Sequence, residues 1–242
     1  MSARVLLIIP AYNEQECILR TYNSIITYCS ENNEHFDVIV INDCSKDSTS
    51  EILDTNNIPH IDLIHNLGIG GAVQTGYKYA KENNYDIAVQ FDGDGQHDIR
   101  YVQHIVKPII DNEAEFVIGS RFVGNENDNF RSSKARRIGI YIISFFIKLV
   151  TGKKVYDTTS GFRAVNKDII EQFSKIYPIE YPEPITTTEL LKKRYTFKEV
   201  SVKMHERAGG TSSIKAWKSV YYMINVILTI LIIKIRRYPN VH

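Results

Sequence analysis

The sequence predicts an α/β fold built on a mostly parallel sheet with helices on both faces. Short apolar runs alternate with segments whose apolar residues recur at helical spacing, which is typical of a doubly wound sheet. Polar clusters directly follow three of the apolar runs, at residues 10–14, 42–47 and 92–96. Ligands bind outside the carboxyl ends of the strands in such sheets, so we expect these clusters to form one site.

The first half of the chain is regular. Residues 5–9 form a continuous apolar run closed by Pro10, as expected of a strand buried on both faces. The remaining strands of this half are expected at residues 36–41, 61–64, 86–91 and 115–118. Helices are expected between them, at residues 13–30, 45–54, 102–110 and in a segment that ends at Glu82 after a Gly-rich turn.

The second half is less regular. Residues 138–150 are apolar almost all round, with basic residues on both sides. The pattern then predicts a turn-rich loop at 158–164, a rigid loop at 177–184, a short helix at 187–194 and a strand at 197–202. A polar loop with two glycines follows at 205–213.

The last apolar run lies between Lys218 and Lys234. Its 15 uncharged residues would span about 22 Å as a helix, which is short for a hydrocarbon core about 30 Å thick. Because the run contains Tyr221 and Tyr222 and has a lysine at each end, we expect an amphipathic helix at the membrane interface, with basic side chains near the headgroups. A buried terminal helix and a membrane-spanning segment completed in an oligomer are the alternatives. The predicted division is a domain of residues 1–213 and a helix with a basic tail at 214–242.

Composition excludes a disordered chain, since 43% of the 242 residues are hydrophobic and 24% are charged. The net charge is only +1, but residues 131–154 hold seven basic residues and no acid. This asymmetry indicates a surface for phosphates or anionic lipids, with a solvated basic face as the alternative. Nucleic acid is not an expected partner. Three cysteines without metal-site spacing indicate free thiols, and the absence of a signal segment indicates a protein made and kept in the cytosol.

Asp92, Gly93 and Asp94 place two carboxylates directly after an apolar run. Hard oxygen ligands select Mg²⁺ or Mn²⁺ and bind it jointly with diphosphate oxygens. Gln96 could add an amide oxygen or hold a metal-bound water, while Gly93 lets the backbone approach a ligand closely. The alternative is an ordinary turn, because an Asp-x-Asp pattern is common by chance.

Asp43 follows the second apolar run. A carboxylate at the end of a strand can accept a ring N–H of uracil or guanine. Ser45 or Asp47 could instead cap the next helix, and both functions can coexist.

Four motifs in this order resemble family 2 glycosyltransferases of the GT-A fold. They are Ile-Pro-Ala-Tyr-Asn-Glu at 9–14, Asn-Asp-Cys-Ser-Lys-Asp-Ser-Thr at 42–49, Asn-Leu-Gly-Ile-Gly-Gly-Ala at 66–72 and Asp-Gly-Asp-Gly-Gln-His at 92–97. Gly-Ser-Arg at 119–121, basic residues 134–137 and Ser-Gly-Phe-Arg at 160–163 make the chain similar to the dolichol- and polyprenyl-phosphate branch. The resemblance weakens after about Val165.

The resemblance implies roles for individual residues. The expected contacts to the nucleotide-sugar come from Pro10, Tyr12, Glu14, Asp43, Asp92 and Gly93. Asp92, Asp94 and Gln96 are expected to hold the metal. Arg121 with Arg136 or Arg137 is expected to meet the acceptor phosphate, and Arg207 is expected to close over the donor diphosphate or the acceptor phosphate.

Two departures from the family pattern affect these expectations. Asn42, Asp43 and Cys44 stand where the family usually has two aspartates and a glycine, so the choice of base is less defined. The Glu-Asp pair that often supplies a catalytic base is absent, because Glu183 is followed by Pro184. A phosphate acceptor is already ionised and needs no base, whereas a hydroxyl needs one. We therefore favour a lipid phosphate, with Glu183 or Asp157 as the base if the acceptor is a hydroxyl.

The sequence thus predicts a metal-dependent inverting hexosyltransferase at the cytoplasmic face of the cell membrane. It would use a UDP-, GDP- or dTDP-hexose and a polyprenyl phosphate for cell-envelope glycan assembly. Transfer to a hydroxyl of a lipid-linked oligosaccharide is the nearest alternative. A sugar-1-phosphate nucleotidyltransferase and a non-catalytic membrane scaffold are the others. A homo-oligomer or a small membrane-protein partner remains open.

Overall fold

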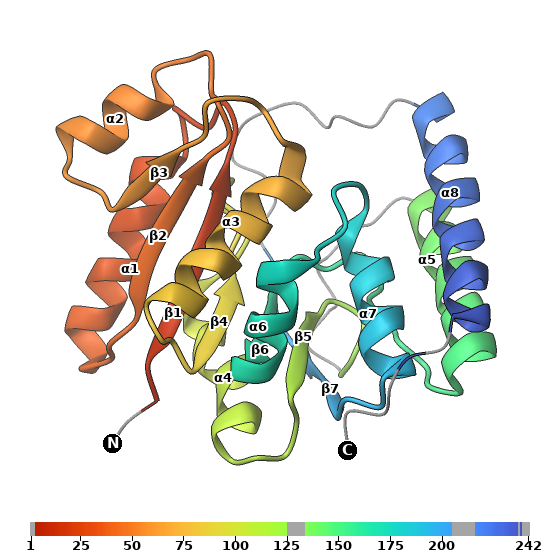
Figure 1. Ribbon diagram of the computed structural model, residues 1–242. Helices are drawn as coiled ribbons and strands as arrows, with labels where there is room; N and C mark the ends of the chain where they lie inside the picture. The colour runs from red at the N-terminus through yellow and green to blue at the C-terminus, as the bar shows by residue number, and fades with distance from the viewer. Residues whose placement is uncertain (1–2, 125–133, 205–215, 237, 239–242) are drawn as a thin grey trace.

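The computed structural model describes residues 3–124, 134–204, 216–236 and 238 (Figure 1). These residues form a seven-stranded sheet in the order β3-β2-β1-β4-β6-β5-β7. The strands are β1 (Val5–Ala11), β2 (Asp37–Asn42), β3 (His60–Asp62), β4 (Ile87–Gln90), β5 (Phe116–Ser120), β6 (Arg163–Asn166) and β7 (Phe197–Ser201). Neighbouring strands are parallel except where β6 pairs with β4 and β5. The expected mostly parallel sheet is confirmed.

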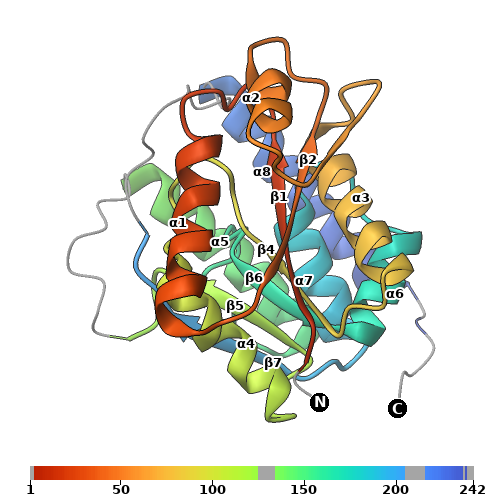
Figure 2. The same cartoon turned by 90° about the vertical axis from the view of Figure 1, so that its left-hand side faces the viewer.

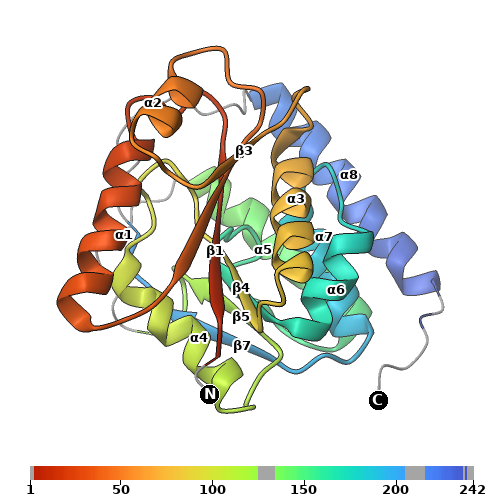
Figure 3. The ribbon, with the colours of Figure 1, turned by 60° about the vertical axis from the view of Figure 1, so that its left-hand side comes forward.

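Helices cover both faces of the sheet. They are α1 (Ile18–Asn32), α2 (Thr49–Thr55), α3 (Gly68–Glu82), the 3₁₀ turn η1 (Ile99–Tyr101), α4 (Val102–Ile110), α5 (Lys134–Thr151), α6 (Lys167–Lys175), α7 (Pro182–Lys192) and α8 (Ala216–Ile235). Figure 3 shows α1 and α4 on one side of the strands and α3, α6 and α7 on the other, and Figure 2 shows the same two layers from a different side.

Strand β1 shows why its sequence is continuously apolar. Leu6 and Ile8 belong to the core cluster shared with α3 and α6, whereas Leu7 and Ile9 belong to the cluster shared with α1 and α4. Since successive side chains point to opposite faces, a strand covered on both sides must be apolar at every position.

The structure corrects the second half of the sequence prediction in two places. The loop expected at 158–164 ends in strand β6, and helix α6 follows it directly. Four residues are too few to show an alternating pattern, and β6 begins with Arg163, which is only 2% exposed. Helix α7 begins at Pro182, inside the expected rigid loop, because proline fits the first turn of a helix, where its missing N–H costs nothing.

Helices α5 and α8 pack against each other at one end of the sheet (Figure 1). Both have a buried face, which includes Ile143 and Ile147 on α5 and Val226 and Ile230 on α8. Both also have an exposed apolar face. Its members are Ile138, Tyr141, Ile142, Phe145 and Leu149 on α5 and Tyr221, Ile224, Leu228, Ile232 and Ile235 on α8. Within the part of the chain that the structure describes, no helix is long and apolar enough to cross a membrane.

Candidate donor site at the carboxyl ends of the strands

The loops after β1 and β2 are joined by hydrogen bonds. The backbone N–H of Asn13 donates to Ser45 Oγ at 3.0 Å, and the N–H of Lys46 donates to Asn13 Oδ1 at 2.8 Å. The N–H of Glu14 donates to Thr49 Oγ1 at 2.9 Å. These bonds hold residues 12–17 as a loop, so α1 begins later than the sequence pattern suggested. Pro10 is buried in β1, and Tyr12 is 43% exposed.

Asp43 lies at the end of β2 and is 3% exposed. Its Oδ1 accepts the backbone N–H of Leu67 at 2.7 Å, and its carbonyl accepts from Asn66 Nδ2 at 3.0 Å. The loop before α3 therefore holds the carboxylate in place. No hydrogen bond to Asp43 Oδ2 occurs among the described residues. That oxygen could therefore accept a ring N–H of a nucleobase.

Cys44 stands in a backbone conformation that suits glycine. Its φ is +57°, in the left-handed region that glycine adopts without steric cost. The turn after Asp43 is thus consistent with the glycine expected there from the family pattern. Asn42, the other departure, donates from Nδ2 to Asp62 Oδ1 at 2.6 Å and links this turn to β3.

Asp92 and Asp94 follow β4 in a tight turn. Asp94 is 2% exposed, and its Oδ1 accepts the N–H of Gln96 at 3.0 Å. The Asp92 side chain is 31% exposed. At Gly93 a Cβ atom would lie 3.3 Å from Ile9 Cγ2, so the turn packs closely on β1. Gln96 is half-buried beside the two carboxylates.

His97 is buried beneath this turn. Its ring stacks on Phe162 with centroids 4.7 Å apart and meets Phe91 edge-on at 5.4 Å. Burial lowers the pKa of the imidazole, against the opposing effect of the Asp92 and Asp94 carboxylates.

The loop before β6, the strand that pairs with β4, approaches Asp92. A Cβ atom at Gly161 would lie 2.9 Å from Gln90 Nε2 and 3.1 Å from Asp92 Oδ2. Ser160 anchors this loop, since its Oγ donates to the carbonyl of Gly119 at 2.6 Å. Glycine at position 161 lets the Ser-Gly-Phe-Arg motif approach the carboxylate.

Arg121 and Asp157 form a buried ion pair. Arg121 Nε donates to Oδ2 and Nη2 donates to Oδ1, both at 2.7 Å, and the side chains are 6% and 0% exposed. The Arg121 backbone N–H adds a third bond to Oδ2 at 3.1 Å. The sequence analysis gave these residues separate roles, as an acceptor contact and a base, which stay predictions. The structure adds a shared role in holding the loops after β5 and α5 together.

Glu183 lies in the first turn of α7, beside Gln90 and Asp92. Burial raises the pKa of its carboxyl, which accepts a hydrogen bond from the Gln90 amide, while Arg163 opposes the shift. A carboxyl with a raised pKa near a candidate metal site has the properties of a general base.

Two polar residues that support this region were given no role from the sequence, Gln90 and the arginine of the Ser-Gly-Phe-Arg motif. Gln90 ends an otherwise apolar strand and is 1% exposed, with no hydrogen-bond partner for its Oε1. Arg163 donates to the carbonyl of Ser160 and to Thr186 Oγ1. The polar last residue of β4 was a signal that could have indicated Gln90.

Two of the predicted arginines cannot be placed in the site. Arg207 lies outside the described residues, and of Arg136 only the backbone is described. Arg137 is exposed near the start of α5.

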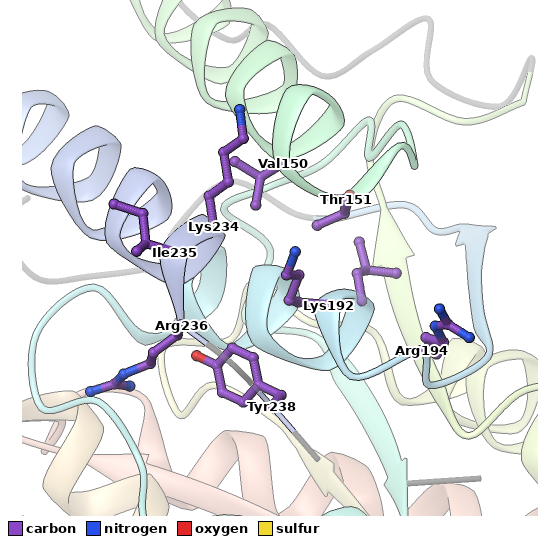
Figure 4. Close-up of a pocket in the computed structure, with 9 residues that line it drawn as sticks. Val150, Thr151, Lys192, Arg194, Lys234, Ile235, Arg236 and Tyr238 are labelled. Carbon is purple, nitrogen blue, oxygen red and sulfur yellow. The ribbon is translucent and has the colours of Figure 1, made fainter. Parts of the chain in front are cut away.

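A basic hollow lies elsewhere, at the C-terminal ends of α5, α7 and α8 (Figure 4). Its cationic lining residues are Lys192, Arg194, Lys234 and Arg236. None of the predicted site residues lines it.

The oxygen-bearing side chains after β4 suit a divalent cation that a diphosphate also binds. The described residues contain no cluster of three or more His, Cys, Asp or Glu side chains that could hold a metal ion. Asp92, Asp94 and Gln96 carry carboxylate and amide oxygens, the ligand type that Mg²⁺ and Mn²⁺ prefer, and these ions commonly complete their coordination with phosphate oxygens and water. These residues therefore fit a hard divalent cation that arrives with a diphosphate.

Comparisons with known proteins identify the family of the chain. The model of glycosyl transferase family 2 matches residues 6–173. A UDP-N-acetylglucosamine–dolichyl-phosphate N-acetylglucosaminyltransferase of Methanococcus voltae is 30% identical over 243 residues, covering 91% of this chain and 94% of that protein. An undecaprenyl-phosphate mannosyltransferase of Micrococcus luteus is 30% identical over 223 residues, covering 87% of each.

Solved structures support the fold. Glucosyl-3-phosphoglycerate synthase of Mycobacterium tuberculosis aligns with a TM-score of 0.68 at 16% identity, covering 98% of this chain and 82% of that one. The expected GT-A fold is therefore confirmed. With a family match over most of its length, this chain is a glycosyltransferase that belongs to glycosyl transferase family 2.

Proposed function

We propose that the chain transfers a hexose, with inversion, from a nucleotide-sugar to a polyprenyl monophosphate. One observation carries the proposal: relatives that align over nearly the whole chain are named as transferases to dolichyl and undecaprenyl phosphates. A sugar linked to a polyprenyl phosphate would serve cell-envelope glycan assembly.

The donor lies across the carboxyl ends of β1, β2 and β4. Asp43 accepts a base N–H, while Pro10, Tyr12 and Glu14 contact the base and ribose. Asp92, Asp94 and Gln96 would hold Mg²⁺ or Mn²⁺, and the bound ion would neutralise charge on the leaving diphosphate. Glucosyl-3-phosphoglycerate synthase has been solved with Mn²⁺ and UDP-glucose, which supports this arrangement.

The acceptor approaches from the side of α5. Its phosphate oxygen attacks the anomeric carbon opposite the leaving diphosphate, and the bond to the diphosphate breaks. Arg136 or Arg137 together with Arg121 orients the phosphate, and Arg207 stabilises the phosphate charge. No base is required, because the phosphate is ionised at neutral pH.

The exposed apolar face of α5 and α8 rests on the membrane that holds the acceptor. Lys148, Lys153, Lys154 and Lys234 are exposed on or near the same helices, as expected for contact with anionic headgroups. We place the enzyme at the cytoplasmic face of the cell membrane as a peripheral protein. Flotation with anionic vesicles should carry the protein, and Phe145→Glu should weaken this association.

Glu183 supports a second candidate function, transfer to a hydroxyl of a lipid-linked oligosaccharide. Its raised pKa and its position near Asp92 are what a hydroxyl acceptor would need. If the acceptor is a phosphate, Glu183→Gln should retain most of the activity. If it is a hydroxyl, the same change should reduce activity by about 10²–10⁴-fold.

The decisive experiment incubates the purified protein and Mn²⁺ or Mg²⁺ with radiolabelled UDP-GlcNAc, UDP-glucose, GDP-mannose or dTDP-glucose and with undecaprenyl phosphate. The proposal predicts label in the organic phase that is lost with Asp94→Ala or EDTA. Donor binding or hydrolysis without any transfer would contradict the phosphate acceptor.

A further inference from the structure

The basic hollow at the C-terminal ends of α5, α7 and α8 gathers cations from separate elements and has a volume of about 560 Å³. Lys192 ends α7, Arg194 follows that helix, and Lys234 lies in the last turn of α8. Figure 4 shows Lys192 between the other two, with the amino groups of both lysines pointing the same way. Three positive charges thus line a space large enough for a phosphate group.

These three cations differ from the fourth cation of the hollow in their partners. Arg236 Nη1 lies 3.4 Å from Glu189 Oε1, which also accepts the hydroxyl of Tyr238 at 3.1 Å. The other three form no ion pair within the part of the chain that the structure describes. Their charge is therefore left for an anion from outside the protein.

Cations at the end of a helix also have a local role. The last carbonyls of a helix carry partial negative charge, so Lys192 and Lys234 stabilise the helices that they end. Arg194 lies beyond the end of α7, with φ +71°. Glycine is usual at this position, because a side chain there has a steric cost. An arginine held in this conformation points to a role outside the helix.

The basic hollow borders the exposed apolar face of α5 and α8. Ile235 belongs to both, since it lines the hollow and its side chain is exposed. On α5, exposed Leu149 directly precedes the lining residues Val150 and Thr151. Cations at the border of an apolar face lie at the depth of lipid headgroups when that face rests on a membrane.

The basic hollow lies at the opposite edge of the sheet from the donor site. Strands β5 and β7 run in the same direction as β4, because β4 and β5 are both antiparallel to β6 and β7 is parallel to β5. Arg194 comes just before β7, at its amino end, whereas Asp92 follows the carboxyl end of β4. A phosphate in the hollow is therefore remote from the proposed site of transfer.

We propose that the basic hollow binds the headgroup phosphate of an anionic phospholipid that is not a substrate. Lys192, Arg194 and Lys234 donate hydrogen bonds to the phosphate oxygens, and Ile235 lies against the acyl chains. The inference rests on the proposed membrane face of α5 and α8. It adds an anchoring site that takes no part in sugar transfer.

Two double variants compare the basic hollow with the surface near it. Lys192→Gln/Arg194→Gln removes two charges from the hollow, and Lys148→Gln/Lys153→Gln removes two exposed charges outside its lining. Arg194→Gly removes a charge and also relieves the backbone, so weaker binding by this variant cannot come from lower stability. Each protein is floated with vesicles of phosphatidylcholine alone or mixed with an equal amount of phosphatidylglycerol.

On the mixed vesicles, we expect the hollow variant to bind about tenfold more weakly than the surface variant. Direct hydrogen bonds to a phosphate are stronger than diffuse attraction to a charged surface. Arg194→Gly should bind these vesicles about tenfold more weakly than the wild type, without a lower temperature of unfolding. On phosphatidylcholine alone, all variants should match the wild type. Transfer to undecaprenyl phosphate in detergent should be unchanged.

Four results would overturn the inference. Equal losses in the two double variants would show diffuse attraction, and lost transfer in detergent would place the hollow in the acceptor site. Calorimetric binding of glycerol 3-phosphate that Arg194→Gly abolishes, with no change in flotation, would assign the hollow to a soluble anion. If the wild type floats with neither kind of vesicle, the proposed membrane face fails together with this inference. Transfer in detergent then still tests the proposed reaction separately.

Discussion

The two halves of the sheet use their polar groups differently. Around β1, β2 and β4, Asp43 and Asp92 stand at strand ends, held by loop backbone and His97. Around β5 and β6, Arg121 and Arg163 are buried and bind Asp157 and backbone carbonyls. In the first half, carboxylate oxygens stand at the strand ends where we propose that the ligand binds. In the second half, buried arginines bind the loops of the protein itself. Residues that look equally functional in sequence therefore act in different ways.

The largest expected effect is in the first half. Asp92→Asn removes one carboxylate charge at the candidate metal site, so we expect sugar transfer to fall by about a thousandfold with little change in unfolding. Asp86→Asn, just before β4 at its opposite end, is the control, since the Asp86 carboxylate accepts the N–H of Arg4 there. Wild-type activity in Asp92→Asn would contradict the view that the first half uses its carboxylates to bind the ligand.

The next effect is in the second half. Asp157→Asn leaves the buried Arg121 charge without its partner, so the free energy of unfolding should fall by about 3–5 kcal/mol. Urea unfolding gives this value. A variant with wild-type stability and lost activity would instead place Asp157 in the reaction.

A smaller effect on stability and donor binding is expected at Gly161, where the loop before β6 meets the end of β4. Gly161→Ala places a methyl group against Gln90 and Asp92, and we expect a cost of about 1–3 kcal/mol together with weaker donor binding. Gly139→Ala on α5 would place a Cβ atom in ordinary contact with Met223 Sδ at 3.4 Å among the described residues, and it should be neutral or stabilising. Unchanged donor binding in Gly161→Ala would mean that the loop does not constrain Asp92.

The smallest effect concerns pH. Burial and the Asp157 charge raise the pKa of Glu199, which accepts N–H groups of Tyr156 and Asp157. The folded protein then holds its proton to higher pH than the unfolded chain, so this contribution to stability is present below about pH 4.5 and is lost as pH rises through the folded pKa. Relative to Glu199→Gln, the wild type should lose stability in urea unfolding as pH rises above about 4.5. A difference that stays constant with pH would contradict this.

Much of the first half could be predicted from sequence. A strand covered on both faces must be apolar at every position. The first polar residue after the apolar run, Asp43 or Asp92, therefore marks the end of the strand. Parallel pairing then places such ends at one edge. The free cysteines were also expected, and all three thiols are free.

The second half depended on tertiary structure. Strand β6 is four residues long and opens with a buried arginine, so no local periodicity marks it. The Arg121–Asp157 pair joins residues 36 positions apart, and the approach of Gly161 to Asp92 joins residues even farther apart. Short-range patterns record which face of an element is apolar. Only the packed sheet decides which charges meet each other and which meet a ligand.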